Sequence, residues 1–138
     1  MKLTFLCSKC RNWLSKNQAE IPERCDVAYR WAAVKFEEGD LESALNSIGT
    51  VFEMSEMMLN SEHFCNSYAS DWLHASSQAL MKILKQMARV DDSIYIHHKT
   101  QVLLREASIK IRVNEQKTEL SSVVVNSNRR KTHLRMVH

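Results

Sequence analysis

Apolar residues recur every three or four positions along most of the chain, the spacing that places side chains on one face of an α-helix. The clearest repeat covers residues 41–59 and includes Leu45, Ile48 and Phe52. A longer repeat covers residues 64–90 without interruption. These two stretches predict two amphipathic helices, and the aromatic residues at helical spacing, Trp13, Trp31 and Trp72 among them, are predicted to lie in the core.

Proline, glycine and aspartate mark the ends of the predicted helices. Pro22 suits the first turn of a helix, because the N–H that proline lacks would be unpaired there. Gly39 suits the end of the same helix because it tolerates positive φ, and Asp40 can cap the helix that follows. Together these signals predict a helical hairpin, two antiparallel helices joined by a tight turn.

The pattern beyond residue 90 is less uniform. A fourth helix is expected over residues 94–112. Residues 109–113 alternate apolar and basic side chains, so they could instead pair with the valines at 123–125 as a β-hairpin. The connection between them has no glycine and contains Glu, Gln and Lys, which favour helix, so helix is the preferred prediction.

Composition narrows the fold to an all-α protein. The 138 residues include only two glycines and one proline, too few turn residues for an all-β chain. We expect one helical domain over residues 1–125, a hairpin packed on two longer antiparallel helices with a small cysteine-bearing amino-terminal segment, and a basic tail over residues 126–138. No apolar run reaches the roughly 18 residues of a membrane span. The amino-terminal apolar stretch is too short for a secretory signal, so a cytoplasmic location is expected.

Residues 28–45, AYRWAAVKFEEGDLESAL, resemble the core of a tetratricopeptide repeat. The matches are Trp31 in the first helix, Gly39 and Asp40 at the turn, and Ala44 in the second helix. The resemblance extends over about residues 28–58, with no second copy one period later. Ala28, Ala32 and Lys35 stand where the family usually has an aromatic residue, a glycine and a tyrosine.

A single repeat cannot bury its own apolar face, and arrays usually contain three or more. The resemblance therefore implies a hairpin packed on other helices rather than a solenoid, and by analogy a protein-binding scaffold. The alternative is a helical hairpin without kinship to that family.

Charge is unevenly distributed along the chain. Residues 36–81 contain eight acidic side chains and no lysine or arginine, whereas the flanking parts are basic and the net charge is +3. The simplest interpretation is a solvated face. The functional interpretation is an acidic surface for a partner, at the rim of a groove beside the hairpin. The candidate partner-binding residues are Glu37, Glu38, Asp40 and Glu42.

These features predict a non-catalytic protein-interaction or adaptor module. No phosphate-binding glycine loop, nucleophile motif or evident carboxylate pair is present, so enzymatic activity is not expected. The alternative is a nucleic-acid-associated regulator, whose salt-dependent binding would use the basic tail. Its residues would be Arg129, Arg130, Lys131 and Arg135.

The long helices also have more apolar surface than one hairpin covers, which predicts a homodimer as a further interpretation.

Cys7 and Cys10 form a CxxC, a spacing at which two thiolates can bind one zinc ion. Cys25 and Cys65 would complete a structural zinc site, with His63 as the alternative fourth ligand. Such a site would fix the short amino-terminal segment to the helical body. Plain thiols remain an alternative, as does a redox pair, although the βαβ context of thioredoxin-like motifs is absent.

Overall fold

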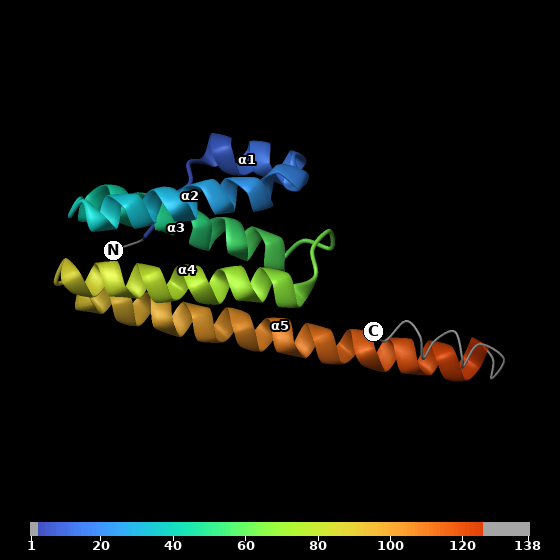
Figure 1. Cartoon of the computed structure of the whole chain (residues 1–138). Coiled ribbons are helices and arrows are strands. Elements are labelled where there is room, and N and C mark those ends of the chain that lie inside the picture. The colour runs from blue at the N-terminus through green and yellow to red at the C-terminus, as the bar shows by residue number, and fades with distance from the viewer. Residues whose placement is uncertain (1–2, 126–138) are drawn as a thin grey trace. The chain divides into compact units, whose positions relative to one another are not determined.

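The computed structural model describes the backbone of residues 3–125 and the side chains of residues 3–110 and 113. Within this part of the chain every regular element is a helix, which confirms the all-α prediction. The elements in chain order are α1 (Ser8–Lys16), the short 3-10 turn η1 (Gln18–Glu20), α2 (Ile21–Glu37), α3 (Leu41–Leu59), α4 (Asn66–Gln86) and α5 (Val90–Val125) (Figure 1). None of the helices described is both long and apolar enough to cross a membrane.

The chain divides into two units, Met1–Leu104 and Arg105–His138, with the boundary inside α5. The sequence placed the end of the folded domain later, at residue 125. In the second unit α5 stays helical to Val125, so the β-hairpin alternative for residues 109–125 is wrong. Residues 126–138, and with them the predicted basic tail, lie outside the described residues. Helices α1 to α4 and the first turns of α5 belong to the first unit.

Helix α3 is the centre of the first unit. It packs against α2 on one side and against α4 on the other (Figure 1). Because both sides are covered, α3 contributes the largest group of buried apolar side chains: Ala44, Leu45, Ile48, Val51, Phe52, Met54, Met58 and Leu59. The first turns of α5 complete this core with Ile96, and Lys99 reaches Glu56 of α3 at 3.4 Å.

The turn between α2 and α3 is built as the sequence predicted. Gly39 adopts φ 81°, in the left-handed region that residues with a side chain rarely occupy. The Asp40 carboxylate then accepts a hydrogen bond from the Ser43 amide at 3.2 Å and caps α3. These two adjacent residues end one helix and begin the next, so the helical hairpin is present.

The turn between α4 and α5 has no such signal in the sequence. Ala88 occupies the left-handed region with φ 59°, where glycine would be the usual residue. The Arg89 amide donates back to the Leu84 carbonyl at 2.8 Å, and the Arg89 side chain pairs with Asp92 at 2.8 Å. Helix α4 therefore stops at Gln86, short of the apolar repeat that continues to residue 90.

The amino-terminal segment is fixed to α3 by a carboxylate. The amides of Phe5 and Leu6 donate to the Glu53 carboxylate at 2.7 and 2.9 Å, and the Arg11 guanidinium donates to it at 2.8 Å. The Glu53 side chain is only 6% exposed. The Phe5 ring lies directly against Gly49, where an added methyl group would overlap it. Glu53 thus performs the anchoring for which the sequence suggested zinc.

Candidate functional site

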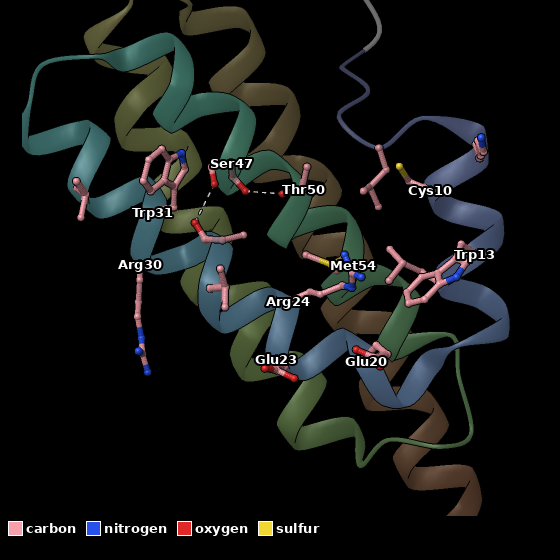
Figure 2. A pocket seen from close by; sticks show the side chains of 16 residues that line it. Cys10, Trp13, Glu20, Glu23, Arg24, Arg30, Trp31, Ser47, Thr50 and Met54 are labelled. Atoms are coloured by element: carbon pink, nitrogen blue, oxygen red, sulfur yellow. Dashed lines mark hydrogen bonds between the residues drawn. The ribbon is translucent and has the colours of Figure 1, made fainter.

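A groove of about 1110 Å³ opens between α1, α2 and α3. The close view in Figure 2 shows that its walls come from all three helices, with Trp13 on α1 facing Arg24 on α2. Its apolar lining consists of Leu6, Trp13, Leu14, Val27, Ala28, Trp31, Val34 and Met54. The groove is therefore an apolar surface formed where α1 crosses the hairpin.

Four of the lining side chains leave large apolar surface open to solvent. Trp13 is 43% exposed and Trp31 is 53% exposed, so the prediction that both are core residues is wrong. Val27 and Val34 are 61% and 49% exposed on the same side of α2 as Trp31. An exposed apolar patch of this kind on a folded protein is typical of an interaction site.

Cations hold both tryptophan rings in place. The Arg24 guanidinium carbon lies 4.7 Å from the centroid of the Trp13 ring, and the Lys35 Nζ lies 4.6 Å from the centroid of the Trp31 ring. These are cation–π distances, at which the ring face attracts the positive charge. The Trp13–Arg24 contact joins α1 to α2 across the groove.

Charges of both signs border the groove. The basic residues in its lining are Lys9, Arg24 and Arg30, and the acidic ones are Glu20 and Glu23. Arg30 is paired with Asp26 on its own helix at 2.8 Å. The mixture gives the groove itself no strong preference for a partner of one charge.

The four predicted acidic residues are exposed but do not line this groove. They lie at the turn between α2 and α3, and are Glu37, Glu38, Asp40 and Glu42. Hydrogen bonds from Ser43 hold the pKa of Asp40 below its usual value, and the Glu38 carboxylate lies 3.4 Å from Lys35 Nζ. Asp40 therefore has a structural role as a helix cap, whereas Glu37 and Glu42 are exposed surface charges.

The predicted zinc ligands do not all come together. Cys7 and Cys10 lie side by side at the start of α1, where the Cys10 amide donates to Cys7 Sγ at 3.3 Å. Cys25 is buried in α2, and the exposed Cys65 precedes α4. Within the residues that the structure describes, no group of three or more His, Cys, Asp or Glu side chains could hold a metal ion. The structure thus retains only the CxxC pair of the predicted zinc site.

The environments of the four thiols differ. Hydrogen bonds from the Cys10 thiol and amide lower the pKa of Cys7, and donation of that thiol proton raises the pKa of Cys10. A hydrogen bond from the Ser67 hydroxyl lowers the pKa of Cys65. Burial raises the pKa of Cys25 to about 12. Because the thiolate is the reactive form, these shifts set an order of reactivity.

Alkylation with iodoacetamide at neutral pH is expected to follow that order. Cys7 and Cys65 should react first, Cys10 more slowly, and Cys25 at least about tenfold more slowly still, because it is buried and stays protonated. Since the pKa of Cys7 is lowered, its labelling should persist to lower pH than that of Cys10. Peptide mass spectrometry over a time course measures each site. Labelling of Cys25 in the folded protein as fast as Cys65 would contradict this assignment.

Two site features had no clear signal in the sequence. Glu53 is one of the eight acidic residues within residues 36–81. Nothing in the sequence distinguishes it from the other seven, because its hydrogen-bond partners come from a distant part of the chain. Trp31 lies on an apolar stripe of α2 that resembles any core stripe. The predicted nucleic-acid residues, Arg129, Arg130, Lys131 and Arg135, lie outside the described residues.

Comparison of the chain with family models, with curated proteins and with solved structures found no match. What the molecule does is therefore inferred from its own residues and their geometry. Among the described residues, the groove and the CxxC pair both offer exposed, chemically distinctive groups.

Proposed function

We propose that this chain is a non-catalytic protein-interaction module that binds an apolar segment of a partner in the groove between α1, α2 and α3. The observation that carries the proposal is the pair of half-exposed tryptophans, Trp13 and Trp31, on opposite walls. Tryptophan is enriched among the residues that supply most of the binding energy of protein interfaces. The resemblance of the hairpin to a tetratricopeptide repeat supports the same class of function by analogy.

The exposed stripe of α2 suggests the form of the bound segment. Val27, Trp31 and Val34 are spaced four and three residues apart, so they form one line along the helix. Seven residues of helix rise about 10 Å, which matches roughly two turns of a partner helix. An amphipathic helix that places its apolar face in the groove is the proposed ligand, a common mode of peptide recognition.

The acidic turn is proposed to add charge complementarity at the end of this stripe. Glu37 and Glu42 are exposed close in sequence to Val34, so basic residues flanking the partner's apolar face would meet them. Charges at the rim of an interface mainly affect the association rate and its salt dependence, so reversing them should weaken capture at low salt. A second copy of this chain is one partner that the proposal allows, and light scattering over a concentration series identifies that case.

Loss of the tryptophans is expected to weaken partner capture by about tenfold or more, the scale of an interface hot spot. The experiment compares proteins retained from a cell lysate by the wild type and by the Trp13→Ala/Trp31→Ala variant, quantified by mass spectrometry. The matched control is Tyr68→Ala, which removes an aromatic side chain that is 42% exposed on α4, outside the groove lining. Circular dichroism checks that each variant is folded. Equal capture by the wild type and the double tryptophan variant would refute the proposal.

The same capture assay tests the acidic turn separately. The variant Glu37→Lys/Glu38→Lys/Glu42→Lys reverses three charges and leaves Asp40 in place, because Asp40 caps α3. Capture should decrease, and the decrease should become smaller as salt is raised, since exposed charges are screened. Unchanged capture at low salt would show that the acidic turn is not part of the binding surface. It would not affect the proposal that the groove binds the partner.

A further inference from the structure

The CxxC pair lies at the amino end of α1. Cys7 is the N-cap residue of α1, with extended backbone angles, and Cys10 is the third residue of the helix. The Cys10 amide donates to Cys7 Sγ at 3.3 Å, so one contact both caps the helix and brings the two residues together. Both cysteines are exposed and free, which leaves both sulfurs accessible to a reagent.

The spacing is compatible with a disulfide. Residues three apart at the start of a helix have Cβ atoms about 5–6 Å apart. A disulfide requires a Cβ separation of about 3.8 Å, so closing the bond needs a small local adjustment of the first turn. Cys7 lies outside the regular helix, where such an adjustment does not break the hydrogen bonds of the later turns.

The surroundings favour a thiolate at Cys7. The amino end of a helix carries partial positive charge from its unpaired amides, and the first turn of α1 contains no acidic residue. Lys9 and Arg24 add full positive charges near Cys10. Cysteines of reactive CxxC pairs usually lie at a helix amino terminus, which is where Cys7 lies here.

We propose that Cys7 and Cys10 are a thiol–disulfide exchange site that accepts low-molecular-weight disulfides. The Cys7 thiolate bonds to one sulfur of the disulfide, the original sulfur–sulfur bond breaks, and one thiolate leaves and takes a proton from solvent. Cys10 then loses its proton and attacks Cys7 Sγ, which releases the second thiolate. The small disulfide is reduced to two thiols, and the two cysteines are oxidised to one disulfide.

The other two cysteines do not supply this chemistry. Cys25 is buried, and burial raises its pKa to about 12, so it is neither accessible nor ionised at neutral pH. Cys65 is exposed, but its thiol contacts the Ser67 hydroxyl, at 3.0 Å, rather than another thiol. Cys65 can form a mixed disulfide but has no neighbouring cysteine in the described residues to resolve it, which makes it an internal control.

The experiment equilibrates the reduced full-length protein with glutathione disulfide and glutathione at several ratios, then quenches with acid and identifies the products by mass spectrometry. The wild type should lose two hydrogen atoms at the Cys7–Cys10 peptide and carry no glutathione there. Cys10→Ser should stop at a glutathione adduct on Cys7. Cys7→Ser should form no internal disulfide and at most a glutathione adduct on Cys10, because the second thiol of the pair is missing.

Two controls accompany this experiment. Circular dichroism establishes that each variant is folded, and Cys65→Ser should leave formation of the Cys7–Cys10 disulfide unchanged. Persistence of both Cys7 and Cys10 as free thiols in excess glutathione disulfide would overturn the proposal, as would stable adducts on both. Zinc that copurifies with the wild type and is absent from Cys7→Ser would also overturn it, in favour of metal binding.

Discussion

A Glu53→Ala variant is expected to lose about 3 kcal/mol of free energy of unfolding and to release the amino-terminal segment from α3. The carboxylate accepts hydrogen bonds from the amides of Phe5 and Leu6 and from the Arg11 guanidinium. Hydrogen bonds to charged groups contribute roughly 1.5–3 kcal/mol each, and the total is reduced here because the donors are partly exposed and regain water. Urea unfolding followed by circular dichroism measures the loss.

The matched control is Glu56→Ala on the same helix. Glu56 pairs with Lys99 at 3.4 Å, but both side chains are partly exposed, and such pairs contribute about 1 kcal/mol or less. Hydrogen exchange at the Phe5 and Leu6 amides should accelerate in Glu53→Ala and stay slow in Glu56→Ala. Equal costs for the two variants would show that Glu53 does not anchor the segment.

Phe52→Ala is expected to cost about 3–5 kcal/mol, the usual range for truncating a buried aromatic residue. Phe52 is 2% exposed on α3, the helix that packs against both α2 and α4. The cavity left behind would lie in the centre of the first unit, where the surrounding side chains are already close-packed. Chemical denaturation with a two-state analysis gives the difference in free energy.

The control for this prediction is Ile94→Ala, which also shortens a large apolar side chain. Ile94 is 61% exposed on α5, so its loss should change stability by no more than about 0.5 kcal/mol. A cost at Phe52 as small as that at Ile94 would mean that α3 is not the centre of the core.

The sequence by itself determined the hairpin, because its signals are local. Gly39 and Asp40 are adjacent, and each acts on the helix next to it, so the predicted limits of residues 41–59 coincide with those of α3. The limits of α4 were less well predicted. Its apolar repeat continues to residue 90, whereas the helix ends at Gln86 with a left-handed turn at Ala88. The sequence does not indicate this turn, because the residue at its left-handed position is alanine rather than glycine.

Only the tertiary structure decided what the polar and aromatic residues do. Glu53 becomes a buried anchor because Phe5, Leu6 and Arg11, more than forty positions away, close onto it. Trp31 has the helical spacing of a core residue, but in the described structure it lies on the wall of an open groove. Whether distant cysteines meet likewise depends on how helices pack. Helix limits follow from interactions between residues that are near neighbours in the sequence. Contacts such as those of Glu53 join residues that are far apart in the sequence, and the spacing of residues along the chain does not specify which distant residues meet.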